Sequence, residues 1–366
     1  MRSRQNILKQ QIVLWICCFS FFVVKAQPQY LSEEAEISIL TCGTGEEMYS
    51  FFGHSALRVK DDGHQMDVVY NWGMFDFNTE GFYSKFVKGD LLYYLDVDRF
   101  SDFIYHYTLD NREVVEQQLD LTYEQKMKIW EEINQQLRTE RRFYTYEFIR
   151  NNCTTKIVDV LNDVLDEPLS VDFPSNQHSY RYILNEGLEK HYFEKLGINL
   201  LFGPSTNKDS ELIFLPVKLK DALEYNQTKY LVSQKTLNKV ENLPSQWWNT
   251  IYFLWGLVLV FAVGSFFKKG LWIYFTLTTL LGLFLLTISL YTHHVELHYN
   301  VLVLFFNPFS LLSLLLKSKK IFFIAVLLTV ISLILMGYEL MFVLSPLIFL
   351  HICYVMAFFL MRLKKN

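Results

Sequence analysis

The stretch at residues 150–155 reads RNNCTT, and apolar side chains recur at helical spacing beyond it, from Ile157 to Leu165. Asparagine caps helix N-termini well, because its side chain accepts hydrogen bonds from backbone N–H groups that have no partner inside the helix. The pattern therefore predicts a helix with Cys153 in its first turn. There the positive end of the helix dipole favours thiolate over thiol, and a thiolate is the nucleophile that acyl transfer requires.

A lone cysteine at a helix start is more often a small buried hydrophobic residue than a nucleophile. A histidine far upstream changes this interpretation. His54 follows Gly53 in a strand pattern over residues 51–59, and an Asp-Gly turn then leads into a return strand over residues 67–73. This hairpin brings Asn71 toward His54, and the glycine leaves room for another side chain to approach the imidazole.

The third catalytic residue stays open at this point. Asn71 matches best by position, and Asp67 and His64 are the alternatives. Two further residues, Arg58 and Asn152, stand next to the predicted catalytic residues in the sequence and are candidate substrate-binding residues.

Composition divides the chain into a polar part and an apolar part. The 366 residues carry a net charge of −4 and no basic tract, which gives no basis for nucleic-acid binding. Residues 1–26 combine a basic start, an apolar run and a small-residue end, and this predicts a signal peptide. Residues 27–245 form the predicted exported domain, and residues 246–366 form the predicted membrane domain.

The exported domain holds two cysteines, Cys42 and Cys153. Its compartment is oxidising, so a disulfide between them is the main structural alternative to a nucleophilic Cys153. Elsewhere in this domain a capping box at residues 122–125 predicts the start of a helix, and short helices are expected around residues 179–196 and 218–240.

The membrane domain contains five apolar stretches near the length that spans a bilayer, at residues 251–267, 271–291, 297–316, 320–337 and 340–361. Eight lysines and arginines fall in the loops and tail on one side of these stretches, and none falls in the two loops on the other side. By the positive-inside rule the exported domain is then outside and the C-terminus is cytoplasmic. An Asn-Pro pair at residues 307–308 predicts a broken third helix.

One outer loop, residues 292–298, reads THHVELH and faces the same side as the predicted catalytic residues. Its polar side chains are candidate contacts to a lipid headgroup or to the exported domain, and a plain exposed loop is the alternative. They are His293, His294, Glu296 and His298. Their spacing fits no common ligand pattern, so no metal is expected.

Taken together, these motifs resemble the Lnb family of Bacteroidota lipoprotein N-acyltransferases. The resemblance is carried by CGTGE at residues 42–46, FGHSALRV at 52–59, YNWGMFD at 70–76 and NNCTT at 151–155, followed by the five predicted spans and the HHxExxH loop. It implies an α+β exported domain of the permuted papain-like kind found in NlpC/P60 and lecithin–retinol acyltransferase proteins, where His precedes Cys, and an all-α five-helix transmembrane domain.

The resemblance also implies an activity. An acyl chain from a membrane phospholipid or another lipid would pass through a thioester on Cys153 to the α-amine of the lipidated N-terminal cysteine of a diacylated lipoprotein. His54 would act as the base and Asn71 would orient it, without a cofactor, on the periplasmic side of the inner membrane. The alternatives are a membrane-tethered cysteine peptidase or amidase of the cell wall, and a non-catalytic envelope scaffold with a Cys42–Cys153 disulfide.

Overall fold

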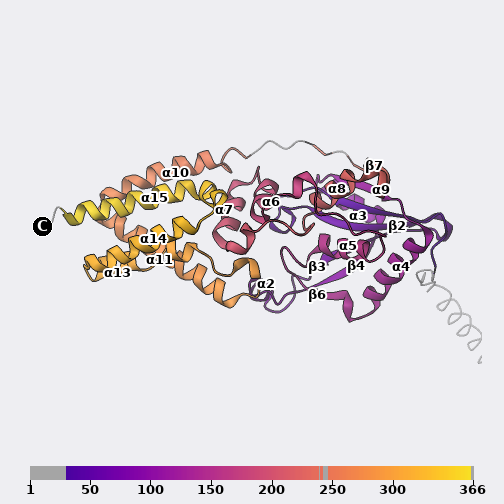
Figure 1. Ribbon diagram of the computed structural model, residues 1–366, viewed down its shortest axis with the longest axis horizontal. Coiled ribbons are helices and arrows are strands. Elements are labelled where there is room, and N and C mark those ends of the chain that lie inside the picture. The colour runs from indigo at the N-terminus through magenta and orange to yellow at the C-terminus, as the bar shows by residue number, and fades with distance from the viewer. Residues whose placement is uncertain (1–29, 239, 242–245, 364–366) are drawn as a thin grey trace, which may run out of the picture.

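Seven antiparallel strands form one sheet in the order β6-β4-β3-β2-β1-β5-β7 (Figure 1). The computed structural model describes residues 30–238, 240–241 and 246–363, so the predicted signal peptide lies outside the described residues. The strands are β1 (Glu36–Cys42), β2 (His54–Asp61), β3 (Met66–Met74), β4 (Leu92–Arg99), β5 (Val114–Leu119), β6 (Phe143–Thr145) and β7 (Leu231–Thr236).

The central strands of the sheet have apolar side chains on both faces, and helices cover both faces and bury these side chains. In β1, Ile39 belongs to the larger core and its neighbour Leu40 to the smaller one, as the two-residue period of a strand requires. Helices α4 (Tyr123–Arg138), α5 (Cys153–Asn162) and α8 (Pro216–Tyr225) pack on the first face, and α3 (Phe100–Leu109) packs on the second. The predicted α+β character is thus confirmed, as an antiparallel sheet with helices.

Local signals in the sequence placed several elements correctly. The β2–β3 hairpin turns at the predicted Asp-Gly pair, and the capping box between Thr122 and Gln125 opens α4. The helix expected over residues 218–240 is wrong at its C-terminal end. Helices α8 and α9 (Gln227–Tyr230) are followed there by β7, which pairs with β5 at the edge of the sheet. This segment is a strand because it forms hydrogen bonds with β5, which is distant in the sequence. No local sequence pattern indicates such pairing.

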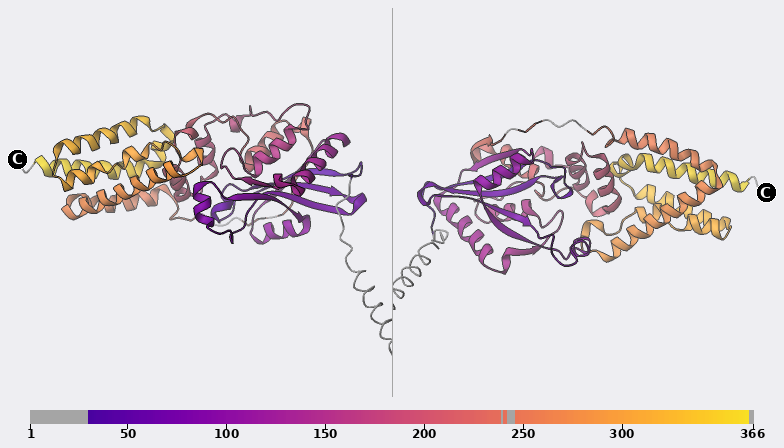
Figure 2. Two further views of the ribbon diagram at one scale, coloured as in Figure 1. Left: turned by 90° about the horizontal axis from the view of Figure 1, so that it is seen from below. Right: turned by 180° about the vertical axis from the view of Figure 1, so that it is seen from behind.

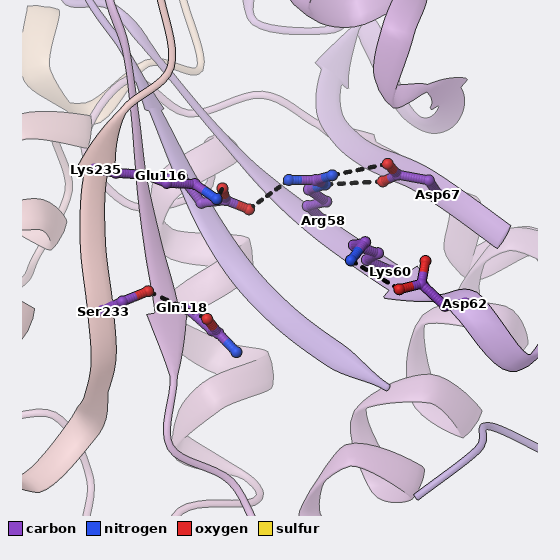
Figure 3. A network of polar contacts seen from close by, with 8 residues as sticks. All are labelled: Arg58, Lys60, Asp62, Asp67, Glu116, Gln118, Ser233 and Lys235. Atoms are coloured by element: carbon purple, nitrogen blue, oxygen red, sulfur yellow. Dashed lines mark hydrogen bonds and ion pairs between the residues drawn. The ribbon is translucent and has the colours of Figure 1, made fainter. Parts of the chain in front are cut away.

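An ion-pair network centred on the buried residues Arg58 and Glu116 crosses the sheet (Figure 3). Arg58 of β2 donates to both carboxylate oxygens of Asp67 in β3, at 2.8 and 2.7 Å, and to Glu116 in β5, at 2.8 Å. Its guanidinium also lies 3.4 Å from the ring centroid of Phe100. Lys235 of β7 pairs with the other oxygen of Glu116 at 3.1 Å. The network joins four strands of the sheet, and each of the three guanidinium nitrogens of Arg58 donates to a carboxylate.

A bundle of apolar helices extends from one end of the sheet domain (Figures 1 and 2). It comprises α10 (Ile251–Val263), α11 (Lys268–Tyr291), α12 (Leu302–Phe305), α13 (Phe309–Leu315), α14 (Lys319–Leu335) and α15 (Tyr338–Leu363). Within the described part of the chain, three segments are long and apolar enough to cross a membrane, namely Lys268–Tyr291, Val295–Leu315 and Tyr338–Met361. The count of five spans stays a prediction.

The break predicted at residues 307–308 is confirmed, since it separates α12 from α13. The Asn307 side chain satisfies the backbone at this break. Its Nδ2 donates to the carbonyls of Leu304 and Ala325, and its Oδ1 accepts from the N–H of Phe309. Such compensation is what permits an interrupted helix at membrane depth.

The bundle is fastened to the sheet domain by its outer loops. The N–H of His293 donates to the carbonyl of Lys88 at 2.7 Å, next to the end of helix α2 (Phe82–Lys88). The Glu339 carboxylate accepts from the Ser179 hydroxyl at 3.1 Å. Helices α6 (Tyr180–Gly187) and α7 (Tyr192–Leu201) lie between the sheet and the bundle in every view (Figures 1 and 2).

The Arg58 network generates a prediction about stability. Arg58→Ala leaves Glu116 buried with only Lys235 as a partner, and breaking a buried ion pair costs about 3 kcal/mol or more. We expect the melting temperature of the detergent-solubilised protein to fall by roughly 6 to 12 °C. The double variant Arg58→Met with Glu116→Leu, which leaves no buried charge, should recover part of the loss. A substrate-binding arginine would instead lower activity without lowering the melting temperature.

Candidate active site

Cys153 is held in place by the cap of its own helix. Asn152 is buried, and its Oδ1 accepts from the N–H groups of Thr154 and Thr155 at 2.9 and 3.0 Å. Its Nδ2 donates to the carbonyls of Phe148 and Phe214, both at 3.0 Å. With the return bond from Asn152 N–H to the Thr155 hydroxyl, this makes a complete capping box. The cap fixes where α5 begins, and therefore where the Cys153 thiol lies.

His54 approaches the Cys153 thiol from the sheet. It is the first residue of β2, and Gly53 before it has φ +81°, with the carbonyl oxygen of Cys42 only 2.3 Å from the position that a Cβ would occupy. No larger residue fits there without displacing β1. A hydroxyl contact of 3.1 Å between Ser55 and Thr154 then fastens β2 to the first turn of α5. The imidazole and the thiol consequently meet at one end of the sheet.

A chain of hydrogen bonds orients the imidazole. Nε2 of His54 lies 3.1 Å from Oδ1 of Asn71, and Nδ2 of Asn71 donates to Asp98 at 2.8 Å. Because the Asp98 carboxylate accepts from the amide nitrogen, the amide oxygen faces the histidine, and Nε2 must carry the proton. Nδ1 is then the basic nitrogen, free to accept the thiol proton.

The surroundings of Cys153 lower the pKa of its thiol. Burial of Cys153 opposes its charged form, but the charge of His54 and hydrogen bonds from the His54 side chain, the Ser55 N–H and the Thr154 hydroxyl outweigh it and lower its pKa below the ordinary value. The site therefore stabilises the thiolate form of Cys153. This is the charge state of an activated cysteine nucleophile.

Gly73, on β3, leaves space for the side chain of Cys153. It has φ +97°, and a Cβ at this position would lie 3.6 Å from the Cβ of Cys153 and 3.9 Å from the hydroxyl of Tyr144. The Tyr144 side chain is buried, and its hydroxyl stands beside the thiol. Sequence reasoning singled out neither Tyr144 nor Asp98. A tyrosine among many aromatic residues carries no local signal, and Asp98 is joined to Asn71 only through strand pairing.

Cys42 does not pair with Cys153, and both thiols are free. Cys42 stands opposite His54 in the β1–β2 ladder and is 1% exposed. Burial raises the pKa of Cys42 to about 12, against the opposing effects of Tyr107 and Arg112. Cys42 is thus a buried neutral thiol, whereas the surroundings of Cys153 favour its thiolate form.

The remaining residues predicted near the site have other partners. Arg58 and Asp67 bind each other, and His64 contacts Asp61 through Nδ1 at 2.8 Å. Asn152 serves as the cap of α5. Of the three residues considered for the third position, Asn71 is thus the one that the structure places against His54.

The predicted outer loop lies against the sheet domain rather than in open solvent. His293 contacts Asp90 through Nδ1 at 2.8 Å, His294 donates from Nε2 to the carbonyl of Phe86 at 2.9 Å, and His298 donates from Nε2 to the carbonyl of Thr292 at 2.9 Å. Glu296 is buried. Over the residues that the structure covers, no group of three His, Cys, Asp or Glu side chains is arranged to hold a metal ion.

Alkylation of the thiols by iodoacetamide tests the electrostatics of the site. Because the pKa of Cys153 is lowered, its thiolate should persist at lower pH than that of an ordinary thiol, and its labelling profile should be displaced to lower pH. His54→Ala keeps the burial and removes the attraction, so the pKa should rise and labelling near neutral pH should slow. Peptide mapping follows Cys153, and Cys42 serves as an internal control that stays unlabelled. An identical profile in the variant would contradict this account.

Asp98 is predicted to act through Asn71. Asp98→Ala releases the amide of Asn71 to rotate, so the imidazole loses its fixed tautomer, and labelling of Cys153 at neutral pH should slow by roughly 10- to 100-fold. Asp96→Asn is the matched control, because Asp96 lies two residues away in β4 and pairs with Arg142 instead. Equal effects of both substitutions would argue against a positioning role.

Residues 23–186 match the family model described as the Lnb N-terminal periplasmic domain. No curated protein and no solved structure matches the chain. The family match and the apolar helices that follow it describe a membrane protein with a periplasmic domain. The chain thus carries an Lnb-type periplasmic domain, consistent with the Lnb family, and Cys153 and His54 both lie within the matched residues.

Proposed function

We propose that this protein is a lipoprotein N-acyltransferase that moves an acyl chain through a thioester on Cys153. The observation that carries the proposal is the hydrogen-bonded series from Cys153 through His54 and Asn71 to Asp98. It supplies an ionised nucleophile, a base of defined tautomer and a residue that orients the base. The order of His before Cys in the chain also agrees with a permuted papain-like domain.

The first half-reaction forms the acyl-enzyme. The Cys153 thiolate attacks the carbonyl carbon of an ester in a membrane phospholipid or another lipid. As the carbon–oxygen bond breaks, the leaving alkoxide takes the proton from the imidazolium of His54, and a lyso-lipid departs. The N–H groups of Thr154 and Thr155 are used by the cap, so the N–H of Cys153 itself is the helix donor left for the oxyanion.

The second half-reaction transfers the acyl chain to an amine. The free α-amine of the N-terminal lipidated cysteine of a diacylated lipoprotein attacks the thioester carbonyl. A carbon–nitrogen bond forms, the carbon–sulfur bond breaks, and His54 takes the proton that the nitrogen gives up. The thiolate is restored and the product is an N-acylated lipoprotein. No metal or nucleotide takes part in either step.

The attachment of the site to the bundle supports lipids as substrates. Thr292 and His293, which follow the last residue of α11, bond to the carbonyls of Val87 and Lys88. The periplasmic domain is thus fixed at the end of a helix that is long and apolar enough to cross a membrane. Donor and acceptor lipids held in the outer leaflet of the inner membrane would meet the thiol there. On this proposal the basic C-terminal tail is cytoplasmic.

The test is intact mass analysis of a lipoprotein's N-terminal peptide from cells that depend on this protein. With wild-type protein the peptide should carry three acyl chains. Cys153→Ala and His54→Ala should each lower activity by about 10³-fold or more, since each removes a group on which the chemistry depends, and diacylated peptide should accumulate.

Cys42→Ala is the matched control, because it removes the other periplasmic thiol without touching the nucleophile, and it should leave the triacylated product in place. Wild-type levels of that product from either active-site variant would contradict the proposal. Release of free fatty acid or of cell-wall peptide without amide formation would instead indicate a hydrolase.

A further inference from the structure

Glu296 is a buried carboxylate without a charge partner. Its residue is 3% exposed, and among the described residues Oε2 has no hydrogen-bond donor and no lysine, arginine or histidine forms an ion pair with it. Its place is nevertheless fixed, since the N–H of Gly203 donates to its backbone carbonyl at 2.6 Å. A Cβ on Gly203 would lie 2.0 Å from the carbonyl oxygen of His298, so this close approach requires a glycine.

The histidines around Glu296 are all committed elsewhere. His293 contacts Asp90, His294 donates to the carbonyl of Phe86, and His298 donates to the carbonyl of Thr292. A buried carboxylate left without such a partner costs free energy, and proteins keep groups of this kind chiefly where function uses them. The loop thus brings three potential cations close in sequence to Glu296 and directs each of them to a different acceptor.

The loop lies against the segment that leads into the Cys153 helix. Leu297, next to Glu296, packs in one apolar cluster with Phe52 and Phe148. The Tyr146 ring meets that of Phe148 edge to face, with centroids 6.4 Å apart. Phe148 also meets the ring of Phe202 edge to face, with centroids 5.3 Å apart, and the next residue, Gly203, is the one that donates to Glu296. Residues 296–297 of the membrane domain therefore lie close to the segment that precedes the catalytic cysteine.

Tyr146 lies between the loop that holds Glu296 and the core beside Cys153. The pKa of Tyr146 lies well above its ordinary value, first because the side chain is buried and then because of the negative charges of Cys153, Tyr93 and Glu296. Tyr146 also stacks on Tyr93, with ring centroids 4.6 Å apart. Tyr146 and Cys153 also pack against the same apolar core, so Tyr146 lies close to the thiol as well as to the loop that holds Glu296.

We propose that Glu296 binds the α-ammonium group of the acceptor lipoprotein. This inference rests on the proposed function and names the group that recognises its second substrate. An ammonium ion offers the charge and the hydrogen-bond donors that the carboxylate lacks. Water and a neutral lipid hydroxyl offer no charge, so Glu296 favours an amine as the group that receives the acyl chain.

The proton balance of the transfer is then complete. The ammonium gives one proton to the Glu296 carboxylate, which becomes neutral, and the free amine attacks the thioester on Cys153. The nitrogen gives its second proton to His54 as the carbon–nitrogen bond forms, and the carbon–sulfur bond breaks to return the thiolate. The proton on Glu296 leaves for water once the amide has departed, and the proton on His54 remains as the one that the next leaving alkoxide takes.

Binding of two unreactive lipopeptides tests the inference. Both are synthetic diacylated lipopeptides. One carries a dimethylated α-nitrogen that keeps its positive charge, and the other carries an acetylated, neutral α-nitrogen. Full-length Cys153→Ala protein in detergent micelles should bind the charged lipopeptide about 10- to 100-fold more tightly, as expected for a buried charge-assisted contact. Adding Glu296→Gln should abolish this preference and leave the affinity for the neutral lipopeptide nearly unchanged.

Glu339→Gln is the matched control. Glu339 also lies at the outer end of a membrane-length helix, but its carboxylate already accepts from the Ser179 hydroxyl. This variant should keep the preference for the charged lipopeptide. If Glu296→Gln keeps the preference too, or weakens both lipopeptides equally, the inference is overturned and Glu296 has a structural role.

A separate measurement distinguishes a failure of this inference from a failure of the proposed function. Wild-type protein is incubated with phosphatidylethanolamine carrying a labelled acyl chain, and label on the Cys153 peptide is measured before any acceptor is added. Equal labelling of wild-type and Glu296→Gln protein, together with a lost preference for the charged lipopeptide, supports the assignment to the second half-reaction. Absence of label on wild-type Cys153 across the lipid donors tested would count against the proposed function, whereas the lipopeptide result decides the role of Glu296 alone.

Discussion

The buried cap formed by Asn152 is the constraint on which the site depends. One carboxamide satisfies two N–H groups of α5 and two carbonyls from segments more than 60 residues apart in the chain, at Phe148 and Phe214. An unsatisfied amide at this depth would cost about 1 to 3 kcal/mol for each lost bond, so the helix start cannot slide. The Cys153 thiol is therefore presented to the end of β2 in one position, and the pKa of the thiol follows from that position.

Pairing of polar groups also explains why the sheet can hold charged residues in its middle. Arg58 is fully paired with Asp67 and Glu116, so its burial fixes the register of β2, β3 and β5. Glu296 is the contrasting case, because it is equally buried and has no such partner for its Oε2. Paired buried charges belong to the framework, and an unpaired one is available to a ligand.

The position of the site relative to the bundle follows from polar contacts of the outer loops and from apolar packing of α7, whose Tyr192 and Leu196 share a buried core with the bundle helices. Loop residues 292–298 bond to the end of α2, to the segment after α7 and to one another, and Glu339 holds Ser179 on another helix of the intervening layer. Backbone and side-chain groups both take part in this attachment, since the Tyr192 hydroxyl donates to the carbonyl of Val343 and the Asn300 amide donates to the carbonyls of Leu200 and Leu201.

The sequence by itself determined the polar and apolar halves of the chain, the hairpin that carries His54 and Asn71, the capped helix that begins at Cys153 and the break at residues 307–308, because each depends on neighbours a few positions apart. Only the tertiary structure decided that Asp98 supports Asn71, that Tyr144 stands beside the thiol, that residues 231–236 form a strand and that Arg58 belongs to the framework. The bond from Asn71 to Asp98 spans 27 positions, the bond from Arg58 to Glu116 spans 58, and the pairing of β7 with β5 spans more than 100. Hydrogen bonding and burial between elements leave no periodic pattern in the chain.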